Sequence, residues 1–272
     1  MCDKKSLFVA QQARESILNM VYKSQCSHVS SALSCVDILS VLYGGIIKNN
    51  PVNPREAKRD RFILSKGHAC TALYAVLSEL GYFDKSNLDH YAENNGLLMS
   101  HVSSNVPGVE FSTGSLGHAL PVATGIALAL RNKKIDSKIY VLMSDGELNE
   151  GSNFEAIMMA SQLSLNNLVA IIDCNKLQAM GKTETIINLE PLEEKFAAFG
   201  WNIFRIDGHN HKLLHDTISK TINHNNRKPS IIIADTVKGK GVSFMENKLE
   251  WHYRSPKEDE YFAAIKEIRG HL

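Results

Sequence analysis

Two short polar segments follow apolar runs that are expected to be buried strands. Asp145 and Gly146 follow the run at residues 138–143, and Asn175 follows the run at 168–172. Ligands of open α/β sheets bind beyond the carboxyl ends of the strands, so Asp145 and Asn175 are expected to lie side by side. A carboxylate with an amide oxygen suits Mg²⁺ or Ca²⁺ rather than zinc, and phosphate oxygens usually complete such a Mg²⁺ shell. These residues predict a metal–diphosphate site.

Glycines and helix starts near these segments support the same chemistry. Gly146 lets the backbone approach a ligand closely, and the helix that follows offers its positive end to an anion. Taken singly, Asp145 could instead cap that helix, and Asn175 could form a turn. Their equivalent positions on adjacent strands favour ligand binding. The Gly-containing loop at 112–117 could also present amide groups to phosphate, or it could be only a turn.

Four of the eleven histidines lie in expected loops or at the ends of elements. They suit hydroxyl binding and proton transfer on a polyol substrate. These four are His28, His68, His101 and His252. Six others are expected at ordinary surface positions, namely His90, His209, His211, His215, His224 and His271. The short basic runs at 133–134 and 238–240 are interpreted as solvated surface.

The elements that must position these groups alternate between strands and helices. Apolar, β-branched runs predict strands at 61–65, 138–143, 168–172, 202–206 and 230–234. Helical spacing of apolar residues predicts helices at 6–23, 36–46, 69–80, 120–131, 150–165 and 211–222. This alternation predicts an α/β fold of three layers, α/β/α, around a mostly parallel central sheet. No linker divides the chain, so we expect one domain over residues 1–272, with a C-terminal extension from about residue 245.

Composition excludes several other classes of protein. The 272 residues include 44% hydrophobic side chains and carry a formal net charge of +1, which gives no electrostatic footprint for nucleic acid. Five cysteines without a CxxC pair argue against a disulfide framework or a zinc site and fit a reducing compartment. The N-terminus lacks signal-peptide features, and we see no apolar run of about 18 residues. We therefore expect a cytoplasmic protein with no membrane span.

Six motifs, in order from about residue 15 to residue 255, resemble those of the transketolase family. The segment SDGELNEGSNFEA at 144–156, closed by Asn175, resembles the thiamine-diphosphate motif. The other five narrow the resemblance to transketolases, and their combination is specific. They are SH…VDIL within 27–39, DRFILSKGH at 60–68, TGSLG at 113–117, TVKGKG at 236–241 and Trp251-His252.

The resemblance implies roles for particular residues. Asp145, Asn175 and the main-chain oxygen of Leu177 would bind Mg²⁺. His28 and His101 would contact substrate hydroxyls and move protons, and with His68, His252 and Glu150 they form the expected catalytic set. Glu150 would join a carboxylate relay across a subunit interface. The expected cofactor contacts, beyond the metal ligands, are His68, Gly114, Leu116, Gly146, Glu147 and His252.

Five positions depart from the family's motifs. Ser144, Ser27 and Ser30 each replace a glycine, and Ser115 and Val29 each replace a proline. All but Val29 keep a small side chain, so cofactor binding is expected to survive. The shape of the loop at His28, and with it the choice of substrate, stays open. Arg254 could contribute to phosphate recognition, although an ordinary surface arginine is the simpler interpretation.

The resemblance also implies a partner. In full-length family members a second domain holds the pyrimidine ring and supplies the glutamate that activates it. We expect a separate C-terminal subunit in an α2β2 heterotetramer that uses thiamine diphosphate and Mg²⁺ to transfer a two-carbon ketol unit from a ketose phosphate to an aldose. The alternatives are the α-subunit of a 2-oxo-acid dehydrogenase, a non-catalytic interaction subunit, and an enzyme specialised for an unusual branched or deoxy sugar.

Overall fold

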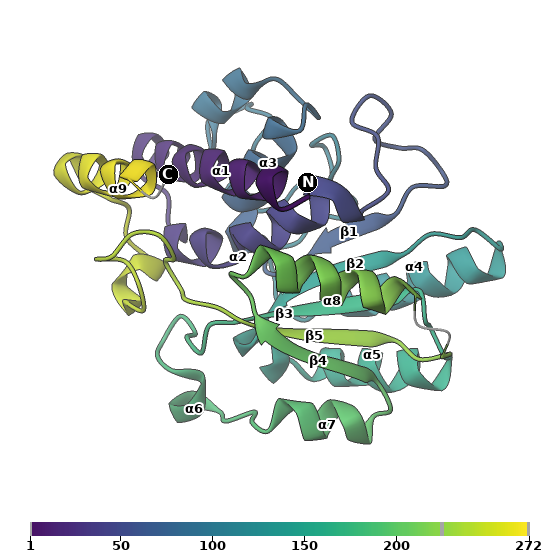
Figure 1. The fold of residues 1–272 in the computed structure, drawn as a ribbon. Helices are drawn as coiled ribbons and strands as arrows, with labels where there is room; N and C mark the ends of the chain where they lie inside the picture. The colour runs from purple at the N-terminus through teal and green to yellow at the C-terminus, as the bar shows by residue number, and fades with distance from the viewer. Residues whose placement is uncertain (1, 224–225, 271–272) are drawn as a thin grey trace.

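The central sheet is parallel throughout, as the alternation of elements predicts. A computed structural model of the chain describes residues 2–223 and 226–270 (Figure 1). Its five strands lie in the order β1-β2-β3-β5-β4, and each ladder between neighbours is parallel. The strands are β1 Arg61–Leu64, β2 Ile139–Ser144, β3 Leu168–Cys174, β4 Asn202–Asp207 and β5 Ser230–Asp235.

Helices cover both faces of the sheet and give the expected three layers (Figure 1). Alternate strand residues serve opposite faces, because successive side chains of a strand point in opposite directions. Tyr140 and Leu142 enter the core beneath α1, α2, α3 and α8, whereas Val141 and Met143 enter the core beneath α4, α5 and α7. The helices are α1 Cys2–Ser24, α2 Val29–Val41, α3 Cys70–Glu79, α4 Ala119–Asn132, α5 Gly151–Gln162, α6 Thr183–Ile186, α7 Leu192–Ala198, α8 His211–Asn223 and α9 Glu258–Gly270.

Helix α2 begins at Val29, seven positions before the predicted start at 36. Its first turns contain Ser30, Ser31 and Ser34, so the apolar spacing that marks a helix is missing there. All thirteen residues of α2 are nevertheless buried. The stretch Val29–Ile46 is long and apolar enough to cross a membrane by those two measures alone, contrary to our expectation, but 89% of it is buried inside the protein. It is placed as the core helix of a globular fold would be.

The C-terminal segment returns to the N-terminal helix. Helix α9, drawn in yellow in Figure 1, packs beside α1, drawn in purple. The rings of Tyr22 and Tyr261 stack with centroids 4.3 Å apart. Arg269 forms an ion pair with Glu15 at 2.7 Å. These contacts hold down the loop between β5 and α9, which carries functional candidates near both of its ends.

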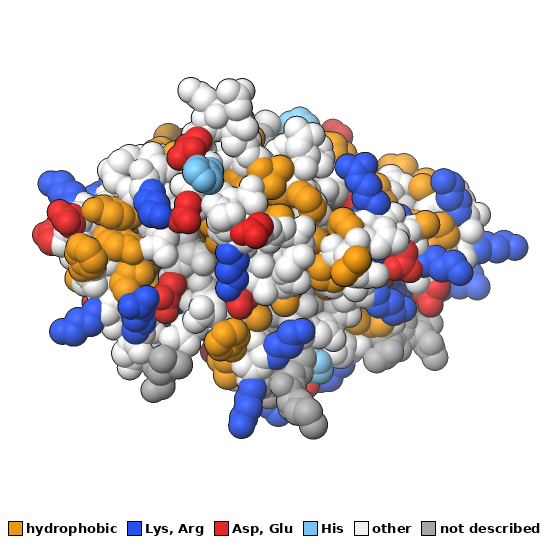
Figure 2. All heavy atoms as spheres, turned by 90° about the horizontal axis from the view of Figure 1, so that it is seen from above, with side chains coloured by type: hydrophobic (Ala, Val, Ile, Leu, Met, Phe, Trp, Pro, Cys, Tyr) orange, Lys and Arg blue, Asp and Glu red, His pale blue; other side chains and the backbone are white. Residues whose placement is uncertain are grey.

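One face of the molecule carries charged side chains of both signs. Figure 2 shows this face, on which the basic and acidic side chains of the described residues are interspersed. The sequence holds 30 basic and 29 acidic residues, so neither sign dominates.

Candidate functional site

A cavity of about 280 Å³ lies at the carboxyl end of the sheet. Its walls come from the loops that follow β1, β2, β3 and β5, and from the start of α2. Ligands of open α/β sheets bind at this edge. The cavity is lined by His28, Ser31, Lys66, His68, His101, Gly114, Leu116, Ser144, Gly146, Asn175, Leu177, Gln178, Ala179, Lys238 and His252.

The four histidines expected to act together do meet in this cavity. The His28 ring lies 5.2 Å from His68, 5.9 Å from His101 and 5.0 Å from His252, measured between ring centroids. The backbone of His28 is left-handed, with φ 76°, and its amide donates to the carbonyl oxygen of His252 at 2.9 Å. This bond fixes the start of α2 against the segment that carries His252.

Burial and neighbouring cations keep three of these imidazoles neutral at pH 7. Burial, with the charges of nearby groups, lowers the pKa of His28 to about 4. Burial and then the charge of Lys238 lower the pKa of His252 to about 3. For His68, burial and the charge of Lys66 hold the pKa well below its usual value. A neutral imidazole has one donor and one acceptor nitrogen, which suits hydroxyl recognition and proton transfer.

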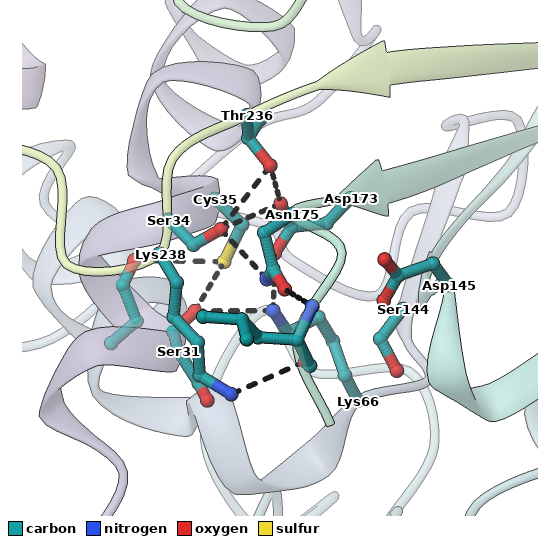
Figure 3. A network of polar contacts seen from close by, with 12 residues as sticks. Ser31, Ser34, Cys35, Lys66, Ser144, Asp145, Asp173, Asn175, Thr236 and Lys238 are labelled. Carbon is teal, nitrogen blue, oxygen red and sulfur yellow. Dashed lines mark hydrogen bonds and ion pairs between the residues drawn. The ribbon is translucent and has the colours of Figure 1, made fainter. Parts of the chain in front are cut away.

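Asp173 holds several walls of the cavity together (Figure 3). Its fully buried carboxylate pairs with Lys66, which follows β1, and accepts hydrogen bonds from Thr236 and, at 2.7 Å, from Ser34 on α2. The Asn175 side chain donates to Ser34 Oγ at 3.1 Å. The Lys66 charge and these bonds outweigh burial and lower the Asp173 pKa. The Asn175 side chain is therefore locked in orientation.

Lys238 corrects one expectation, because it lies in the cavity wall and not on a solvated face. It is 2% exposed, and its ammonium lies 3.0 Å from His252 Nδ1 and donates to Leu177 O at 3.3 Å. Burial and then the charge of Lys66 lower its pKa to about 8. No carboxylate in the described part of the chain forms an ion pair with it. Lys238 thus offers positive charge to the cavity.

Asp145 is a buried carboxylate with no ion-pair partner among the described residues. It is 5% exposed, and the hydrogen bonds that it accepts there come from backbone amides, Gly146 N at 2.8 Å and Lys176 N at 2.6 Å. Burial, with the charge of Asp173, raises its pKa to about 6. Asp145 lines a second cavity of about 640 Å³, which shares Asn175 and Leu177 with the first. The three predicted metal ligands therefore lie at the boundary between the two cavities.

This donor set fits a hard divalent cation that also binds a diphosphate. One carboxylate, one amide and one main-chain oxygen are suitable oxygen ligands, and Mg²⁺ with so few protein ligands usually completes its shell from phosphate and water. The described residues contain no group of three His, Cys, Asp or Glu side chains that could hold a metal without such help. The Gln178 Nε2 donor is buried at the cavity and has no hydrogen-bond partner in the described part of the chain. A Cβ at Gly146 would come within 2.6 Å of the Gln178 side chain, so any larger residue there would require Gln178 to move.

Besides Asp145, which lines only the second cavity, two predicted site residues line neither cavity. Glu147 is fully buried, and its carboxylate turns away to accept bonds from Ser65 Oγ and, at 2.9 Å, from Gly117 N. It fixes the loop that carries Gly114 and Leu116, so its geometry is that of a support and not of a cofactor contact. Glu150 is exposed outside the cavity, just before α5.

Two of the expected surface histidines are withdrawn from the surface: His211 is buried and His209 is partly buried. His209 and His211 both hydrogen-bond to Asp37, at 2.8 and 3.0 Å. His90 and the half-buried His215 do reach the surface, whereas residues 224 and 271 lie outside the described residues.

Sequence reasoning also missed Lys66 and Asp173 as members of the site. A usable signal existed for Asp173, because a charge inside an otherwise apolar strand must find a partner. Lys66 stands two residues before His68, within a motif in which the histidine alone drew a functional prediction.

The fold and the cavity define an α/β protein with a ligand site at the carboxyl edge of its sheet, and comparisons with known proteins make this specific. Residues 6–271 match the family model "Transketolase, thiamine diphosphate binding domain". The chain belongs to this transketolase family.

Among relatives, the chain is 41% identical to one of the subunits of the apulose-4-phosphate transketolase from Phocaeicola vulgatus, over 95% of this chain and 92% of the relative. It is 40% identical to the 6-deoxy-6-sulfo-D-fructose transketolase subunit SqwG of a Clostridium species, over 95% and 94%. Human transketolase is 32% identical over 97% of this chain, which spans only 42% of that protein.

The solved structures agree on the fold. Transketolase from Campylobacter jejuni superposes with a TM-score of 0.92 at 30% identity, over 98% of this chain and 43% of the solved one. The predicted α/β/α architecture and the membership of the transketolase family are therefore both confirmed.

Proposed function

We propose that this chain is the diphosphate-binding subunit of a two-chain, Mg²⁺- and thiamine-diphosphate-dependent transketolase. The proposal rests on the environment of Asp145 in a chain of the transketolase family. Its buried carboxylate lies near Asn175 and Leu177 and has no ion-pair partner among the described residues. A divalent cation bound to the diphosphate would supply the missing charge. Lys238 and Gln178 would add hydrogen-bond donors for the phosphate oxygens.

The cofactor would supply the electron sink for the negative charge that develops on the former carbonyl carbon of the ketose when its bond to the next carbon breaks. The residues of this chain then bind, orient and exchange protons. His28, His68, His101 and His252 surround one space, and three of them are neutral at pH 7. Neutral imidazoles can hold sugar hydroxyls and take or return protons at those oxygens. The reaction we propose is transfer of a two-carbon ketol unit from a ketose phosphate to an aldose.

The need for a partner chain rests on the comparisons. The chain covers 42% of human transketolase, and three relatives of similar length are named as subunits. We propose that a C-terminal subunit completes the cofactor site, as α2β2, and that the exposed Glu150 meets it. The names of these relatives make an unusual ketose, branched or 6-substituted, as reasonable a donor as a common one. A cytoplasmic location also remains part of the proposal.

The test is an assay of the assembled pair. The chain is co-expressed with the protein encoded beside it, purified, and supplied with Mg²⁺, thiamine diphosphate, a ketose phosphate and an aldose phosphate. We expect two-carbon transfer in the pair, none in this chain alone, and a loss of at least about 100-fold in Asp145→Ala. Asp216→Ala, which removes an exposed carboxylate on α8, is the matched control.

Stabilisation by Mg²⁺–thiamine diphosphate without activity would keep the site and point to an unusual sugar. Neither activity nor stabilisation in the pair would favour the non-catalytic alternative, because a ligand of the folded state must raise the melting temperature.

A further inference from the structure

His209 bridges a buried carboxylate and the loop that carries Lys238. It lies between β4 and α8, away from the cavity lining. Its Nδ1 lies 2.8 Å from Asp37 Oδ2, and its Nε2 accepts a hydrogen bond from Val237 N at 2.8 Å. Val237 immediately precedes Lys238 in the chain. One imidazole therefore connects α2 with the backbone next to a cavity lysine.

The hydrogen bonds settle which nitrogen of His209 carries the proton. A backbone amide can only donate, so Nε2 must be the acceptor and Nδ1 must carry hydrogen toward Asp37. Asp37, 4% exposed, is also bound by Arg14 at 2.6 Å and by His211 at 3.0 Å. These partners outweigh burial and hold the Asp37 pKa well below its usual range. The carboxylate is a fixed, charge-balanced anchor.

The bond to Val237 is one of several that hold the chain on either side of Lys238. Thr236 donates to Asp173, and Gly239 N donates to Ser30 O at 3.0 Å. The carbonyl oxygens of Val237 and Lys238 accept from Lys240 N at 3.2 Å and from Asn247 N at 2.9 Å. His209 accepts from the amide immediately before Lys238, so it helps to set the direction in which the chain enters Lys238. The Lys238 ammonium must then reach both His252 Nδ1 and Leu177 O. Loss of the His209 acceptor would leave a part-buried amide unpaired and let the loop turn.

We propose that His209, oriented by Asp37, is a positioning residue that aims Lys238 into the candidate cofactor site. The orientation of His209 toward Asp37 and Val237 follows from the hydrogen bonds alone, whereas the consequence for cofactor affinity rests on the proposed function. Asp37 lies on the same helix as Ser31 and Ser34, so the anchor holds the loop in register with two side chains that face the site.

Two conservative substitutions separate the two bonds of His209. His209→Asn keeps a donor near the Nδ1 position for Asp37 and loses the acceptor for Val237. His209→Gln keeps an acceptor near the Nε2 position and loses the donor. Because a net hydrogen bond is worth about a factor of three to ten, we expect Val237 amide exchange to rise by roughly that factor in the Asn variant and to stay nearer wild type in the Gln variant. His215→Asn, on the outer part of α8, is the control.

Cofactor affinity gives the functional readout. In the pair, His209→Asn should weaken Mg²⁺–thiamine diphosphate binding about three- to tenfold, with partial rescue in His209→Gln. If His209 acts through Lys238, the Asn substitution should add nothing in a Lys238→Met background.

The two proposals fail in different ways. Wild-type protein that binds no cofactor would sink the proposed function, while amide exchange still decides the positioning role. Unchanged Val237 exchange in His209→Asn, or additive effects with Lys238→Met, would overturn the positioning role.

Discussion

Asp37 and Asp145 are both buried carboxylates, but their surroundings are opposite. Asp37 is 4% exposed and has a guanidinium and two imidazoles around it, and its pKa lies well below the usual range. Asp145 is 5% exposed and accepts hydrogen bonds from two backbone amides without an ion pair in the described part of the chain, and its pKa rises to about 6. The negative charge of Asp37 is balanced inside the protein, and this site serves the fold. The negative charge of Asp145 is not balanced by an ion pair, as is expected of a cation-binding site before its cation binds.

The largest effect on stability should come from removing the Asp37 carboxylate. In Asp37→Asn the Arg14 guanidinium loses its carboxylate while it remains largely buried. Removal of one partner of a buried pair typically costs about 3–5 kcal/mol, so we expect a loss of that size in the free energy of unfolding. Urea denaturation of the apo chain measures it. Asp216→Asn, at an exposed ion pair, should change the free energy of unfolding by less than about 0.5 kcal/mol. Equal losses in both variants would contradict the expected difference between the buried and the exposed carboxylate.

At Asp145 the corresponding substitution is expected to raise the stability of the apo chain, not to lower it. Asp145→Asn removes an uncompensated buried charge whose pKa is raised from 3.8 to about 6. At about 1.4 kcal/mol per pKa unit, less the loss of one backbone bond, the apo chain should gain roughly 1–2 kcal/mol at pH 7. The same variant should lose the stabilisation by Mg²⁺–thiamine diphosphate. Thermal melts with and without the cofactor check both, and a destabilised apo variant would contradict an unbalanced charge at Asp145.

The histidine cluster predicts how apo stability depends on pH. His28 and His252 have native pKa values of about 4 and 3, below the ordinary value of 6.5. The unfolded chain therefore binds more protons below pH 6.5, and stability should fall as pH decreases from 6.5 toward 4. Asp145 acts in the opposite sense, because its raised pKa stabilises the native state as pH falls through 6.

Melting temperatures at a series of pH values test this dependence. A His28→Asn, His252→Asn double variant should show a shallower decline below pH 6.5 than the wild type. An identical decline in both proteins would assign the pH effect to other groups.

The smallest effect should be at Glu150. This side chain is exposed and makes no hydrogen bond or ion pair within the described part of the chain. Glu150→Gln should change the free energy of unfolding of the isolated chain by less than about 0.5 kcal/mol. If Glu150 meets the partner subunit, the same variant should lower the activity of the pair. A large loss of stability in the isolated chain would instead make Glu150 a structural residue.

Much of the fold could be read from periodicity. Five predicted strands appear within one or two residues of their expected bounds, because buried parallel strands are continuous apolar runs. The start of α2 was missed because its serines bury themselves against neighbours without an apolar pattern. Helix α9 was missed because it buries only Ala264, Ile265 and Ile268, and most of its other residues are charged.

The site was predictable where side chains follow strand ends, and less so where they act through others. The four histidines of the cavity were expected together, and they do meet. Lys238 was interpreted as solvated, because a basic run shows no sign of the burial that tertiary packing imposes. Glu147 was expected at the cofactor because it adjoins Gly146, but a 3₁₀ turn at Gly146–Asn149 points it inward. Spacing along the chain does not reveal such turns.

The cavity joins segments that lie far apart in the chain, and this has a kinetic consequence. The Ser31 hydroxyl meets His252 across 221 residues. Contacts of such separation close large loops and form late in folding, whereas the N-terminal helices can form first during synthesis. The proposed cofactor can then recognise only a chain that is already complete. Its binding would stabilise the folded protein and slow unfolding without speeding folding.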